Sequence, residues 1–136
     1  MVKMSVVYEG NLRCRLTHGP SGQGIVTDAP VDNMGKGEAF SPTDLTAASL
    51  ASCMMTVMGI VAQRHNIDLK GAKLEVSKEM VTTPVRRIGK ITVDFFMPKG
   101  IDPAKRSMLE RAAETCPVHK SLSPDVLVPV HFYYPD

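Results

Sequence analysis

Aromatic side chains are scarce in this chain of 136 residues. Tryptophan is absent, and Phe, Tyr and Trp together supply only 5% of the sequence. The core must therefore rest mainly on other hydrophobic residues. Hydrophobic residues still make up 43% of the chain and include nine Met. We expect a single domain, residues 1–136, whose core consists mainly of aliphatic side chains and Met.

A strong excess of charge of either sign is also missing. The chain has 16 Lys and Arg against 14 Asp and Glu, which leaves a formal net charge of +2. Proteins that attract nucleic acid or an anionic membrane surface normally carry a clear basic excess. We therefore expect neither nucleic acid nor a membrane among the partners.

The N-terminal segment MVKMSVVYEGN lacks the apolar stretch of a secretory signal peptide. Only three cysteines are present, an odd number that does not suggest a framework of disulfides. We expect a cytoplasmic location, where a disulfide is more often transient and catalytic than structural.

Several motifs of cofactor and metal chemistry are absent. The glycine-containing stretches GPSGQG and GKGEAF match neither a phosphate-binding loop nor a dinucleotide fingerprint, and no Gly-x-Ser-x-Gly sequence occurs. Two cysteines separated by two residues are also missing. Cys116 and His119 form one short pair, whereas a zinc site needs about four ligands. We expect no metal and no cofactor.

The longest regular stretch of the sequence, residues 41–65, predicts one long helix. Ser41 is a good N-cap, Pro42 suits the first helical position, and Asp44 completes a capping box. Asn66 can adopt the left-handed conformation that ends a helix. Cys53 lies near the middle of this helix.

The interior of this helix carries no charged residue between Leu45 and Ala62. A helix that is apolar on nearly every side needs cover on every side, so we expect burial and a homodimer. One stripe is small and mildly polar, and suits close approach of another backbone or the lining of a narrow pocket; its members are Ser49, Ser52, Thr56, Gly59 and Gln63. The alternative is a membrane span, for which the stretch is just long enough. Against it, Ala, Ser, Thr and Met outnumber bulky aliphatic residues, and no aromatic belt flanks the segment.

The rest of the chain reads as short strands and a second helix. Apolar residues recur at helical spacing from Asp102 to Cys116, with Asp102 as N-cap and Pro103 after it, and a short helical turn follows at residues 118–122. A long loop is expected at residues 28–40. The expected strands are residues 2–8, 12–17, 24–27, 72–82, 87–97 and 126–134. This order predicts an α+β fold in which antiparallel sheets cover the long helix and the second helix.

The residues best suited to chemistry are Cys53 and Cys116, both on predicted buried helix faces. A buried cysteine often acts only as a small hydrophobic residue. If the two thiols met, one could be oxidised to a sulfenic acid and the other could condense with it to a disulfide. An ionised thiol in mid-helix needs a nearby cation, and Arg13 and Arg15 are the candidates. Both could equally be solvated residues of a strand.

Two spaced motifs, SPTDLTAASLASCM and TCPVHKSL, resemble the OsmC/Ohr family of peroxide-protective proteins. The early segment YEGNL is similar to the first hairpin of that family, and the resemblance covers most of the chain. It implies an intertwined α+β homodimer with active sites at the dimer interface. It also implies reduction of organic hydroperoxides, with Cys53 as the peroxidatic thiol and Cys116 as the resolving thiol. The reductant would be a dithiol or a lipoylated protein.

One position departs from the family pattern. The best-known branches carry Glu directly after the proline that starts the helix, and this Glu pairs with the catalytic Arg; here the position is Thr43. Asp44, one residue later, and Glu38, in the preceding loop, are the carboxylates that could replace it. This departure leaves open an alternative function, a non-enzymatic small-molecule-binding or stress protein on the same fold.

Overall fold

A computed structural model describes residues 1–135 of the chain. The chain divides into two compact units, the first ending at Thr46 and the second starting at Ala47. The strands are β1 (Met4–Gly10), β2 (Arg13–His18), β3 (Gly24–Asp28), β4 (Lys73–Val81), β5 (Arg87–Phe96) and β6 (Val130–Tyr133). The helices are a 3₁₀ turn η1 (Val31–Asn33), α1 (Pro42–Arg64), α2 (Pro103–Glu114) and α3 (Pro117–Ser121). The fold is α+β, as predicted.

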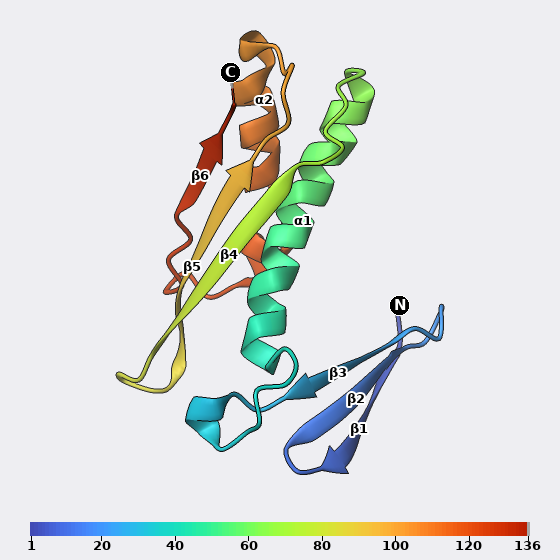
Figure 1. Cartoon of the computed structure of the whole chain (residues 1–136), viewed down its shortest axis with the longest axis vertical. Helices are drawn as coiled ribbons and strands as arrows, with labels where there is room; N and C mark the ends of the chain where they lie inside the picture. The colour runs from blue at the N-terminus through green and yellow to red at the C-terminus, as the bar shows by residue number, and fades with distance from the viewer. Residues whose placement is uncertain (136) are drawn as a thin grey trace. The chain divides into compact units, whose positions relative to one another are not determined.

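The first unit contains an antiparallel sheet in the order β1-β2-β3, shown in blue in Figure 1. Asn11 and Leu12 join β1 to β2, and both have positive φ, at 54° and 63°. Two such residues form the tight turn whose twist suits a hairpin. β2 then pairs with β3 in a register that places Arg13 opposite Asp28.

The loop of residues 29–40 is closed at its base. The N–H of Asp28 donates to the carbonyl oxygen of Phe40 at 3.0 Å, which joins the two ends of the loop. Gly35 permits a close approach within it, because a Cβ there would lie 1.8 Å from the carbonyl oxygen of Ala29. The loop leads directly into α1, whose predicted capping box is confirmed. The N–H of Asp44 donates to Ser41 Oγ, and the N–H of Ser41 donates to Asp44 Oδ2, both at 3.0 Å.

α1 buries one stripe of its surface within the second unit. The buried residues recur at helical spacing: Ala47, Leu50, Ala51, Met54, Met58 and Ala62. Ser52, Thr56 and Ile60 lie on exposed positions, so a single chain does not cover the helix on all sides. Asn66 closes α1 with the predicted left-handed φ, here 54°. By length and composition alone α1 could span a bilayer, a test that the core helix of a globular domain also passes.

The second sheet has the order β4-β5-β6, and Figure 1 shows it as one layer beside α1 and α2. Alternate residues of β5 face the core, where Ile91, Val93 and Phe95 are fully buried. One pairing differs from the predicted antiparallel sheets, because β6 pairs with β5 in parallel. α2 and α3 lie between β5 and β6 in the chain, and this crossover returns β6 in the same direction as β5.

α2 begins as predicted. Asp102 is its N-cap and accepts a hydrogen bond from the N–H of Ala104, and Pro103 follows. Its inner face adds Leu109 and Ala113 to the core.

Candidate active site

Two cysteines meet in the second unit. Cys53 lies in the middle of α1 and is half-buried, whereas Cys116 lies between α2 and α3 and is 0% exposed. Cys53 packs against the buried cluster that contains Cys116. Its Sγ also lies 3.9 Å from the carbonyl oxygen of Leu50, on the same helix as Cys53. Both cysteines are reduced.

The surroundings of Cys116 raise the pKa of its thiol. Burial is the main cause, and the hydrogen bond with Cys53 adds to it. The N–H groups of Val118 and His119, in the first turn of α3, oppose this rise without cancelling it. The Cys116 side chain makes no capping hydrogen bond to α3. Cys116 therefore keeps its proton to a higher pH than an ordinary thiol.

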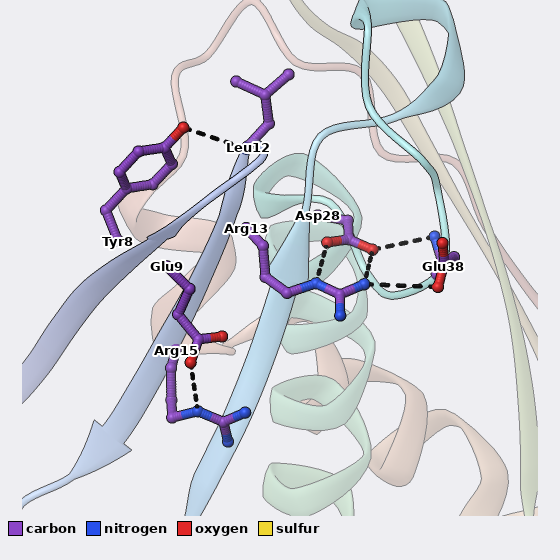
Figure 2. A network of polar contacts seen from close by, with 7 residues as sticks. All are labelled: Tyr8, Glu9, Leu12, Arg13, Arg15, Asp28 and Glu38. Atoms are coloured by element: carbon purple, nitrogen blue, oxygen red, sulfur yellow. Dashed lines mark hydrogen bonds and ion pairs between the residues drawn. The ribbon is translucent and has the colours of Figure 1, made fainter.

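In the first unit, Arg13 forms a hydrogen-bonded ion pair with Asp28 (Figure 2). Its Nε donates to Asp28 Oδ1 at 2.7 Å and its Nη2 donates to Asp28 Oδ2 at 2.8 Å. This two-pronged pairing is the strong form of an Arg–carboxylate contact. The hydrogen bonds and charge of Asp28 raise the pKa of Arg13, so the guanidinium is permanently charged.

Asp28 is the residue that the sequence analysis missed. Its side chain is 3% exposed and accepts a third hydrogen bond, from the N–H of Glu38 at 3.1 Å. The bonds from Arg13 are the largest cause of a lowered pKa of Asp28, and they outweigh the opposing effect of burial. A signal for this contact exists in the sequence. If the turn at Gly19–Pro20–Ser21–Gly22 is centred between Pro20 and Ser21, the hairpin register places Arg13 opposite Asp28.

The other predicted site residues have different contacts. Arg15 Nε donates to Glu9 Oε2 at 3.1 Å on an exposed part of the sheet. Glu38 Oε2 lies 3.7 Å from Arg13 Nη2, and its side chain is 61% exposed. Asp44 uses its carboxylate to cap the N–H of Ser41. Within the described part of the chain, no group of three or more His, Cys, Asp or Glu side chains is arranged to hold a metal ion.

The sequence profile of the family described as OsmC-like protein matches residues 35–130. The chain therefore belongs to the OsmC-like protein family.

A solved structure from Psychrobacter arcticus 273-4 is 44% identical, with a TM-score of 0.92, over 98% of this chain and 96% of that one. That protein is provisionally described as an osmotic stress induced and detoxification response protein. An organic hydroperoxide resistance protein OsmC from Legionella pneumophila is 18% identical, with a TM-score of 0.77, over 97% of this chain and 96% of that one. OhrB of Bacillus subtilis, an organic hydroperoxide resistance protein, is 21% identical, with a TM-score of 0.69, over 98% of both chains. At such low identity the last two show a shared fold alone. No curated protein sequence matches the chain significantly.

Proposed function

We propose that this protein is a thiol-dependent peroxidase that reduces organic hydroperoxides and protects the cell from oxidative stress. The observation that carries the proposal is the packing of half-buried Cys53 against the buried cluster that contains Cys116, whose Sγ lies 3.9 Å from the Leu50 carbonyl oxygen of the same helix. Membership of the OsmC-like family supports it, as do the hydroperoxide resistance proteins that share the fold.

In the first step, the thiolate of Cys53 attacks the distal oxygen of the hydroperoxide. The O–O bond breaks, Cys53 becomes a sulfenic acid, and the alkoxide takes up a proton and leaves as an alcohol. Cys53 is the better candidate for attack because it is partly accessible, whereas Cys116 is fully buried and retains its proton.

In the second step, the thiol of Cys116 attacks the Cys53 sulfenic acid. A disulfide forms and water leaves. The neighbouring positions of Cys53 and Cys116 in the reduced protein support this step, because the sulfenic acid would form beside the Cys116 thiol. A dithiol, for example on a lipoylated protein, then reduces the disulfide by exchange and becomes a disulfide itself.

Arg13 is the cation that we assign to the thiolate. A guanidinium next to a cysteine favours its ionised form. Arg13 is held rigidly by two bonds to Asp28 and is 36% exposed, so its charge remains available outside that pair. Arg15, whose partner Glu9 lies on an exposed part of the sheet, is the weaker candidate.

A homodimer is part of the proposal. The sheet of the first unit exposes large apolar side chains, among them Val6 at 63% and Ile25 at 47%. They line a groove of about 360 Å³ with Met4 and Leu16. In the second unit, a groove of about 390 Å³ beside α1 and β4 includes the small residues Ala48 and Ser52. Apolar surface of this kind supports cover by a second copy of the chain.

We propose a cytoplasmic location, where dithiol reductants are available.

The direct test is turnover of cumene hydroperoxide with dihydrolipoamide as reductant. We expect consumption of the peroxide and a disulfide between Cys53 and Cys116 in the oxidised protein, identified by peptide mass spectrometry. A lack of turnover together with the absence of that disulfide would reject the function.

The second candidate is a non-enzymatic binding protein for a small apolar molecule. The groove beside α1 and β4 favours it, because apolar side chains such as Met55, Leu74 and Val76 line much of it. On this hypothesis a Cys53→Ser variant retains both ligand binding and protection of cells from stress. Loss of peroxide protection in that variant would exclude it.

A further inference from the structure

Arg13 and Asp28 form a cross-strand pair at the end of the β2–β3 ladder. The register places them directly opposite each other, and the carboxylate accepts from both Nε and Nη2. Opposite residues of antiparallel strands have closely spaced Cβ atoms, so the hairpin itself brings these side chains together. Nη1 takes no part in these bonds, and Figure 2 shows it directed away from Asp28 and Glu38.

Asp28 also holds the loop that follows it. Its main-chain N–H donates to the carbonyl oxygen of Phe40, and its side chain accepts from the N–H of Glu38. The same residue therefore joins the strand that carries Arg13 to the last residues before α1. Because its carboxylate is almost fully buried and accepts three hydrogen bonds, it has little freedom to change position.

We propose that Asp28 is a positioning residue: it holds the Arg13 guanidinium in one orientation and leaves Nη1 available to an anionic group. This inference rests on the proposed function, in which Arg13 is the cation that stabilises the thiolate.

The two other carboxylates are less suited to this task. Asp44 is engaged with the N–H of Ser41 at the start of α1. Glu38 lies 3.7 Å from Nη2 on an exposed side chain, so this contact is longer and better solvated than the Asp28 pair. The bonds from Arg13 also lower the pKa of Asp28, which keeps its carboxylate charged at neutral pH.

The test compares Asp28→Asn with Glu9→Gln. The first change removes the charge that holds Arg13 and keeps the shape of the side chain. The second is a matched carboxylate-to-amide change in the exposed Arg15–Glu9 pair of the same sheet. Two quantities are measured: the pH dependence of Cys53 alkylation by iodoacetamide, resolved by peptide mass spectrometry, and kcat/KM for cumene hydroperoxide.

For Asp28→Asn we expect alkylation of Cys53 at neutral pH to slow about tenfold, with the midpoint of the profile moved to higher pH. We expect kcat/KM to fall on the order of 10- to 100-fold, because small displacements of a catalytic group have effects of this size. For Glu9→Gln we expect the alkylation rate of Cys53 and kcat/KM each to change by less than about twofold. If Asp28 only neutralised nearby charge, its removal would make alkylation faster. Unchanged or faster alkylation in Asp28→Asn overturns the proposal.

Arg13→Lys covers the case in which Asp28→Asn does not fold. It keeps the positive charge but cannot form the two-pronged pair, so the same slowing is expected, and an unchanged alkylation rate overturns the proposal. Alkylation needs no turnover. An inactive wild type would reject the proposed function, while the difference between the variants would still decide the role of Asp28.

Discussion

The Sγ of Cys116 lies 3.9 Å from the carbonyl oxygen of Leu50, about one helical turn before Cys53. This contact holds the Cys116 thiol against α1 in the reduced state. In the proposed mechanism, that position lets Cys116 capture the sulfenic acid that forms on Cys53.

The first prediction concerns the order of the two thiols. With one equivalent of cumene hydroperoxide, Cys116→Ser should stop at a sulfenic acid on Cys53, which dimedone traps. Cys53→Ser should lose nearly all peroxide reduction, at least about a thousandfold, because Cys53 is the thiol that attacks the peroxide in the proposed mechanism. Cys14→Ser, on β2, is the control and should retain wild-type activity. Dimedone adducts on Cys116 in place of Cys53 would reverse the assignment.

The second prediction concerns stability in acid. The lowered pKa of Asp28 means that its carboxylate stabilises the fold above the ordinary Asp range and loses this effect as pH falls towards the lowered value. The free energy of unfolding of the wild type should therefore exceed that of Asp28→Asn at pH 7, and the difference should shrink below about pH 4. Urea unfolding at several pH values measures it.

Glu75→Gln is the matched control for acid stability, because Glu75 forms an exposed pair with Lys73 at 2.9 Å. It should show little difference from the wild type at any pH. A difference for Asp28→Asn that stays constant between pH 7 and pH 3 would contradict the role of the Arg13–Asp28 pair in acid stability.

The third prediction concerns Tyr134, near the C-terminus. Its hydroxyl donates to Glu110 at 3.2 Å, and the Arg106 guanidinium lies 4.2 Å from the ring centre. Burial, followed by the charge of Glu110, raises the pKa of Tyr134 to about 12. The neutral phenol therefore stabilises the fold below about pH 10, and this effect is lost as pH rises towards 12.

Absorbance titration of the tyrosines at alkaline pH should show one late component, which Tyr134→Phe removes. The same variant should lower the free energy of unfolding by about 1 kcal/mol at neutral pH, because one hydrogen bond is lost. If the late component persists in Tyr134→Phe, another tyrosine has the raised pKa.

The fourth prediction concerns the proposed homodimer. Val6→Glu places a charge in the apolar groove of the first unit. Burying an unpaired carboxylate costs several kcal/mol, so dimerisation should weaken by at least about a hundredfold. Sedimentation velocity over a range of concentrations measures this. Val85→Glu is the control, because Val85 is a similarly exposed valine (62%) that lies between β4 and β5. This variant should dimerise as strongly as the wild type. A wild type that is monomeric at all concentrations would remove the dimer from the proposal.

The local elements of this protein could be predicted from its sequence because their signals act over a few residues. Ser41 and Asp44 cap each other three residues apart, and Asn66 ends the helix through its own φ. The alternation that predicted β5 has a period of two, and its inward residues are the buried ones. The similarity of the two cysteine motifs to a known family likewise needed no coordinates, since it lies in the order of residues along the chain.

Contacts between distant segments required the tertiary structure. The parallel pairing of β6 depends on where the α2–α3 crossover returns the chain, which no local pattern records. The choice of Asp28 over Asp44 or Glu38 as the partner of Arg13 depends on strand register and on burial, which decide whether two charges can form both hydrogen bonds away from water. The contact of Cys116 with Cys53 has the same origin, because packing of α1 against the α2–α3 junction brings together side chains that are far apart in the sequence.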